Sequence, residues 1–174
     1  MRKLGYVLLA VLLMFSMVAC EKQSETGDDN QQKALSSVET TQEEIADDFG
    51  FVMTPPQNAK DAKWAVVDEC IGELTFKLDG QNVAFRITTD DAPEAESDAL
   101  VMMQTISGIN EELAKSETGN VGDMNAFVFF NSGKSGAVIW YSDDNIIYTV
   151  AVDKKASSDN LLELAQTLDR LANE

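Results

Sequence analysis

The sequence predicts an α+β domain: one antiparallel sheet of about six strands, with a short N-terminal helix and a C-terminal helix packed on one face. The dipeptide Asp79-Gly80 separates two runs of alternating apolar and polar residues, which is the pattern of a tight β-hairpin. Three further apolar runs, separated by turn-forming residues, follow nearer the C-terminus. The chain then ends in leucines at helical spacing.

Residues 1–19 have the composition of a secretory leader: Arg2 and Lys3 open it, and an apolar or small-residue run follows. The run stops at Cys20, and this junction resembles the bacterial lipoprotein box, although Met17 stands where that box prefers leucine. The resemblance implies that residues 1–19 are a lipoprotein signal peptide. It also implies that Cys20 carries diacylglycerol through a thioether. An ordinary signal peptide with an incidental Cys20 is the alternative.

The rest of the chain divides into a tether and one domain. Residues 20–40 contain the lipidated cysteine and a polar, acidic stretch that we expect to be disordered. Residues 41–174 are long enough for a single globular domain. The net charge of the whole chain is −17, and this charge argues against nucleic acid as a partner.

The domain is expected to open with a short helix. Thr41 and Glu44 have the spacing of a capping box, and Gly50 suits a left-handed helix end. The prolines at 55 and 56 then predict an extended segment.

A first hairpin is expected to join the run at 64–67 to a strand starting near Cys70. A second hairpin turns at Asp79-Gly80 and pairs Leu74 with Phe85 and Glu73 with Arg86. We interpret the latter pair as an exposed ion pair that contributes well under about 1 kcal/mol. An arginine presented to an anionic ligand is the alternative.

Strands are also expected at 124–130, 136–141 and 145–152. A two-residue turn between the last two would pair Tyr141 with Ile146 and Ile139 with Tyr148. The final helix follows Ser157 and Ser158, either of which suits its cap.

Residues 89–123 are the least regular part. We expect a polar loop, then an apolar segment that forms a strand or one short helix, then another loop. Long loops are often functional, so a binding site is expected here first.

The order of these features resembles a family of small extracytoplasmic domains of unknown function in Firmicutes lipoproteins. The resemblance spans most of residues 45–172, and this chain departs from it by an acidic insertion before Ile106. It implies a sheet-plus-helices domain outside the membrane and no particular reaction. The matching positions are Gly50, Phe51, Pro55, Phe85, Arg86, Ile106, Ser107, Gly108, Trp140 and Tyr148.

The residue inventory excludes several chemistries. The chain has no histidine, which removes histidine triads and histidine metal sites. With Cys20 used for lipid, Cys70 is expected to be a small apolar residue without a disulfide. Asp90-Asp91 and Asp143-Asp144 fit turns and lack a calcium-loop pattern. We therefore expect no metal, no cofactor and no catalytic residues.

Three functions stay open. We favour a non-catalytic module, anchored outside the cell membrane, that binds an envelope protein or a peptide. The alternative is a carrier or sensor that holds an apolar small molecule between the sheet and the helix at 157–172. An enzyme that uses carboxylates is the third.

Replacing Cys20 tests the anchor. A Cys20→Ser chain has no thiol to acylate, so the protein is expected to move from the membrane fraction to the soluble extracytoplasmic fraction. Fractionation followed by immunoblotting checks this, with a membrane protein that has no lipid as the control. A Cys20→Ser chain that stays fully membrane-bound would contradict the lipid attachment.

Overall fold

The structure, a computed structural model, describes residues 36–173, so the predicted leader, Cys20 and most of the predicted tether lie outside the described residues. In chain order the elements are β1 (Ser37–Thr40), α1 (Gln42–Phe49), β2 (Lys60–Val67), β3 (Ile71–Leu78), β4 (Gln81–Thr89), α2 (Glu96–Ser107), β5 (Lys115–Val121), β6 (Met124–Phe130), β7 (Gly136–Tyr141), β8 (Ile146–Val152) and α3 (Ser158–Asn173).

The strands form one eight-stranded antiparallel sheet in the order β1-β2-β3-β4-β8-β7-β6-β5. It consists of two four-stranded meanders, β1–β4 and β5–β8, that join where β4 pairs with β8. The α+β class and the antiparallel sheet are therefore as predicted, with two more strands than expected within the described residues.

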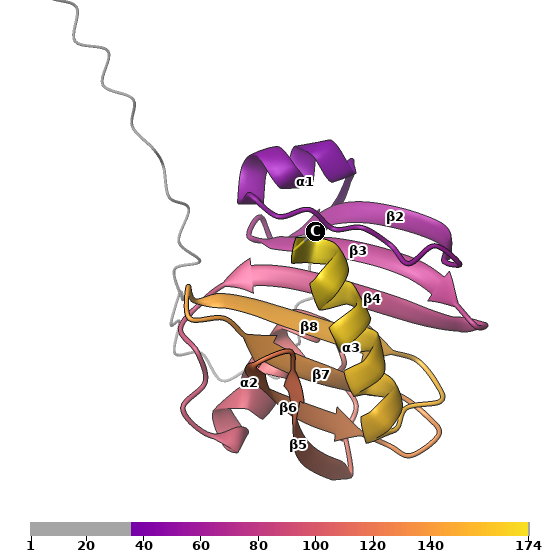
Figure 1. Cartoon of the computed structure of the whole chain (residues 1–174), viewed down its shortest axis with the longest axis vertical. Coiled ribbons are helices and arrows are strands. Elements are labelled where there is room, and N and C mark those ends of the chain that lie inside the picture. The colour runs from indigo at the N-terminus through magenta and orange to yellow at the C-terminus, as the bar shows by residue number, and fades with distance from the viewer. Residues whose placement is uncertain (1–35, 174) are drawn as a thin grey trace, which may run out of the picture.

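Helices cover both faces of this sheet. Helix α3 lies in front of it and α2 behind it, whereas α1 lies beside the β2 end (Figure 1). The core on the α3 face includes Ile45 of α1 and Leu161, whereas the core on the other face includes Met103 of α2. The predicted N- and C-terminal helices do share one face. The helix on the other face, α2, comes from the segment for which a strand or one short helix was expected.

The β3–β4 hairpin has the predicted register. Leu74 pairs with Phe85 and Glu73 pairs with Arg86. Asp79 and Gly80 have φ angles of +49° and +78°, as a two-residue type I′ turn requires. Turn chemistry and side-chain alternation agree here, so the sequence determines the pairing.

The predicted β7–β8 register was wrong by one residue. Tyr141 pairs with Ile147, and Trp140 pairs with Tyr148. The turn is longer than two residues, because the Ser142 N–H donates to the Ile146 carbonyl at 3.0 Å and Asn145 has a φ of +60°. Both strands are buried on both faces, so alternation could not choose between the two registers.

The predicted helix caps are present. Thr41 and Glu44 form a complete capping box on α1, and Gly50 ends the helix in the left-handed region. At the start of α3, the Asn160 N–H donates to the Ser157 hydroxyl at 3.2 Å, so Ser157 is the cap.

Two predicted irregular segments contain regular structure. Residues 37–40, assigned to the tether, form β1 beside β2. Between residues 89 and 123, the apolar segment forms α2, and the expected second loop contains the edge strand β5. Because β5 pairs on one side and is mostly exposed, its sequence is polar and shows no apolar alternation.

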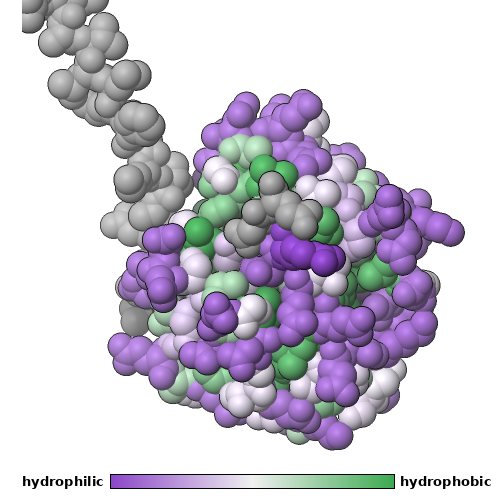
Figure 2. Space-filling view, in the orientation of Figure 1, coloured by the Kyte–Doolittle hydropathy of each residue, from purple (hydrophilic) through white to green (hydrophobic). Residues whose placement is uncertain are grey.

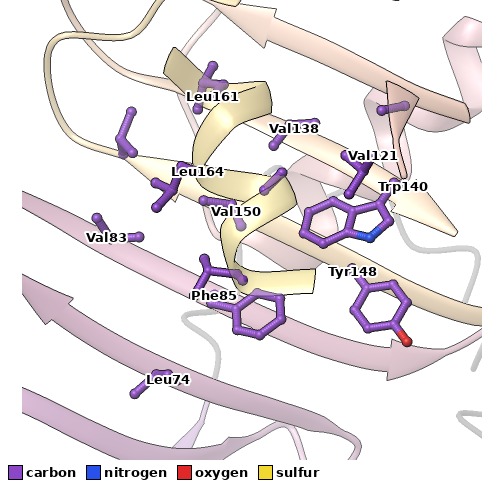
Figure 3. Close-up of a cluster of buried hydrophobic side chains, with 14 of the residues drawn as sticks. Leu74, Val83, Phe85, Val121, Val138, Trp140, Tyr148, Val150, Leu161 and Leu164 are labelled. Carbon is purple, nitrogen blue, oxygen red and sulfur yellow. The ribbon is translucent and has the colours of Figure 1, made fainter. Parts of the chain in front are cut away.

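Three aromatic rings stack in the core on the α3 face: Phe85, Trp140 and Tyr148 (Figure 3). The Trp140 and Tyr148 ring centroids lie 5.2 Å apart. Burial, and then the nearby charges of Asp169 and Asp144, raise the pKa of the Tyr148 hydroxyl. The register of β7 and β8 therefore places a tyrosine where the ionised form is disfavoured.

The outer surface on the α3 side is mainly hydrophilic, with separated apolar patches (Figure 2). None of the helices within residues 36–173 combines the length and apolar character that a bilayer-spanning segment requires.

Tyr148 predicts an alkaline dependence of stability. Its folded-state pKa lies above the ordinary value of 10.0, so above pH 10 the unfolded chain loses this proton first. The free energy of unfolding is expected to fall as the pH rises from 10 toward the folded-state pKa. Urea denaturation of the wild type and Tyr148→Phe measures this contribution. If the free energy of unfolding changed equally with pH in both proteins above pH 10, the assignment to Tyr148 would be contradicted.

Candidate functional site

A groove of about 900 Å³ crosses the sheet on the α2 face. It is open along its length rather than enclosed. The loop after α2 forms one wall, and the ends of four strands form the floor and the other wall. The lining residues are 61–63, 75–77, 82–84, 108–111, 135 and 151–153.

Small side chains form the groove floor. Lys63 pairs with Thr75, Thr75 with Ala84, and Ala84 with Ala151, so these residues form one row across β2, β3, β4 and β8. Ala84 and Ala151 belong to the core on the α2 face, but their side chains are short. The surface is therefore lower along this row than beside it.

The end of α2 is held above the floor by a buried ion pair. Arg86 contacts the Glu73 carboxylate through Nε and Nη2, both at 2.5 Å. The Arg86 Nη1 also donates to the Ile106 carbonyl at 2.5 Å. The two side chains are only 13% and 11% exposed. The predicted pairing is confirmed, but the expectation of a weak surface ion pair was wrong.

Gly108 leaves room for the Arg86 guanidinium at the end of α2. Its φ is +71°, and a Cβ atom there would lie 3.0 Å from the Arg86 Nη1. The next turn is fixed by the Ile109 N–H, which donates to the Ser107 hydroxyl at 3.2 Å. The loop at 108–111 thus begins from a defined position over β4. The predicted anionic-ligand role of Arg86 has no geometric support, since its guanidinium faces Glu73 and Ile106.

The two ends of the groove differ. The outer end lies at β2 and β3, where the Lys77 Nζ lies 2.8 Å from the Asp61 carboxylate. This hydrogen bond lowers the pKa of the Asp61 carboxyl and raises the pKa of the Lys77 ammonium. The inner end lies where β8 ends and β7 begins. There the Asp153 carboxylate accepts hydrogen bonds from the Asn82 backbone N–H at 2.9 Å and from the Asn82 Nδ2 at 2.6 Å. Ser135 is 6% exposed, and its hydroxyl has no hydrogen-bond partner among the described residues.

A carboxyl with a raised pKa lies away from the groove. Burial raises the pKa of Asp169 on α3, and the hydrogen bond from the Trp140 Nε1 at 3.3 Å opposes this shift. This group faces the core on the α3 side, opposite the groove. No cluster of three or more Cys, Asp or Glu side chains within residues 36–173 has the arrangement of a metal site.

The predicted acidic turns do come together. The Asp90 N–H donates to the Asn145 carbonyl at 3.1 Å, which places Asp90-Asp91 beside the turn that contains Asp143-Asp144. Their carboxyls are distributed over two turns at one end of the sheet. They lie at the other end of β4 and β8 from Asn82 and Asp153, and they do not line the groove.

Cys70 requires a correction. The expectation that it has no disulfide was wrong, because Cys70 is disulfide-bonded. Cys20 lies outside the described residues, so its lipid attachment stays a prediction, and a thioether on Cys20 would exclude that residue from any disulfide.

Sequence reasoning identified the groove only in part. Residues 108–111 fall within the segment at 89–123 where a site was expected, and they form one wall. The floor and Ser135 were missed, because they depend on the register of strands distant in sequence.

Comparison with protein-family models, with curated proteins and with solved structures found no match to this chain. The resemblance to Firmicutes lipoprotein domains therefore stays a prediction.

Removing one partner of the buried ion pair is expected to destabilise the fold. Arg86→Met leaves the Glu73 carboxyl buried without its partner, which costs about 3–5 kcal/mol in the free energy of unfolding. The double variant Glu73→Leu/Arg86→Met removes both partners and is expected to recover most of that loss. Denaturant titration of the wild type, Arg86→Met, Glu73→Leu and the double variant checks this. A double variant as unstable as the sum of both single variants would contradict the pairing.

Proposed function

We propose that this protein is a non-catalytic binding module, anchored by lipid on Cys20 at the outer face of the cell membrane. In this proposal, the groove on the α2 face receives a segment of an envelope protein or a peptide. The open groove of about 900 Å³ is the observation that carries the proposal. The leader, the cysteine junction and the acidic linker support the location.

The charges in the groove favour binding over catalysis. Asp61 is ion-paired with Lys77, and Asp153 accepts two hydrogen bonds from Asn82. The hydrogen bond from Lys77 lowers the pKa of the Asp61 carboxyl, whereas a general acid needs a raised pKa. The chain also contains no histidine for proton transfer near neutral pH.

An open groove suits a segment of a partner better than an enclosed apolar ligand. A carrier would need an apolar cavity between the sheet and α3. That space is occupied by the packed side chains of Leu161, Leu164 and Leu168, among others. A smaller pocket of about 380 Å³ beside α3 is lined mainly by polar residues such as Asn58, Gln81, Asn160 and Thr167.

The strongly negative charge supports a protein or peptide partner over nucleic acid. At −17, the chain would repel a polyphosphate backbone and anionic lipid headgroups. This repulsion would hold the folded domain away from the membrane surface while the lipid retains it there.

Site-specific photocrosslinking in intact cells tests the proposal. A photoreactive residue at the exposed groove wall, Glu111, is expected to capture a defined partner segment. The same residue at Glu43, which is exposed on α1 and lies outside the groove lining, is the matched control. Ala151→Leu raises the groove floor and is expected to reduce capture from position 111 at least about fivefold.

The result is interpretable only if the Ala151→Leu chain folds, and its thermal unfolding curve establishes that. Equal capture from positions 111 and 43, or capture unaffected by the leucine in a folded chain, would contradict a partner site in the groove.

A further inference from the structure

The length of the groove limits its ligand. It runs across the strands from Lys63 on β2 to Ser135 at the start of β7, past β3, β4 and β8. Four inter-strand spacings of about 4.8 Å give about 19 Å. An extended peptide rises about 3.3 Å per residue, so about five or six residues span this distance.

The loop after α2 is tied to the β6–β7 turn near the inner end of the groove. Asn131, in that turn, donates through Nδ2 to the Glu112 carbonyl at 2.9 Å and accepts from the Ala114 N–H at 3.0 Å. Ser135, which lines the groove, lies beside this contact because the Asn131 N–H donates to the Ser135 carbonyl at 2.9 Å. A chain that runs along the floor from β2 therefore meets this contact at its far end.

The chemistry of the inner end suits a protonated amine. Because Gly136 pairs with Val152, Ser135 lies opposite Asp153 on the groove face. Asp153 accepts hydrogen bonds from the neutral Asn82, and no described lysine or arginine forms an ion pair with it. The buried Ser135 hydroxyl, which has no described partner, can accept a hydrogen bond there.

The outer end suits a carboxylate. Lys77 forms a hydrogen-bonded ion pair with Asp61 at 2.8 Å, whereas Lys63 makes a 3.9 Å contact with the highly exposed Glu39 and acts on Asp61 through its charge without a hydrogen bond. Between the two ends, the floor offers Thr75, Ala84 and Ala151 and leaves room for small or aliphatic side chains. Peptide groups that face the open side stay hydrated.

We propose that the groove binds the free amino-terminal end of an extended peptide of about five residues. The amino group lies at Ser135 and Asp153, small or aliphatic side chains lie over Ala84 and Ala151, and a carboxylate lies at Lys63. This inference rests on the proposed function and specifies its ligand class.

Retention of defined peptides by the full mature chain in detergent tests the inference. The probe is a pool of pentapeptides made from Gly, Ala, Val and Leu with both termini free, and mass spectrometry quantifies what is retained. Acetylating the amino terminus is expected to reduce retention at least about fivefold, because the charged donor is lost. Ser135→Ala is expected to reduce it about threefold to tenfold.

Charge reversal tests the orientation. Lys63→Glu is expected to remove the preference for a free carboxylate over a carboxyl-terminal amide. Arg170→Glu reverses an exposed charge on α3, which covers the other face of the sheet, and is expected to leave retention unchanged. Both variants retain the buried core, and thermal unfolding curves verify that they and Ser135→Ala fold.

Equal retention of acetylated and free pools, or retention of neither pool, would overturn the inference. If position 111 still crosslinks a partner in cells, only the ligand class falls and the proposed function stands. If neither peptide retention nor crosslinking at position 111 occurs, both are overturned.

Discussion

The buried contact between Glu73 and Arg86 is the interaction on which the groove depends. The Arg86 guanidinium binds the Glu73 carboxylate on the neighbouring strand and the Ile106 carbonyl in the last turn of α2, each at 2.5 Å. A charge this deeply buried is tolerable only when its hydrogen-bond partners are complete. The contact therefore locates the end of α2 over β4, and Gly108 is required because any Cβ there would press against Arg86. The position of the loop wall follows from this arrangement.

The groove results from two properties that act together. A row of small side chains, Thr75, Ala84 and Ala151, crosses β3, β4 and β8. A loop runs above this row and is held at Arg86 on one side and at Asn131 on the other. Helix α2 covers the rest of this face, so the strip beside the loop stays open. The face under α3 differs, because α3 packs its leucines directly on the sheet. The asymmetry between the faces explains why we assign binding to the α2 face.

Where local chemistry was decisive, the sequence predicted the structure. Asp79-Gly80 defined the β3–β4 register, and Thr41, Glu44 and Gly50 defined the ends of α1. The β7–β8 register failed because both faces of those strands are apolar, so a one-residue shift leaves the pattern unchanged. Helix α2 and strand β5 lacked clear signals: Ala95 provides no side-chain cap, and β5 is a polar edge strand. The groove floor and Ser135 become neighbours only through pairings between distant strands, which no local pattern reports.

Hydrogen exchange of the loop in an Arg86→Lys chain tests the central claim most directly. Lysine keeps the positive charge, but its single ammonium nitrogen cannot replace the planar guanidinium that donates to both Glu73 and the Ile106 carbonyl. The account predicts that amides at 106–111 lose at least about tenfold of their protection while β3 and β4 stay protected, because only the anchor of the loop is removed. Unchanged protection at 106–111, with or without a uniform loss across the sheet, would show that the ion pair does not hold the groove wall.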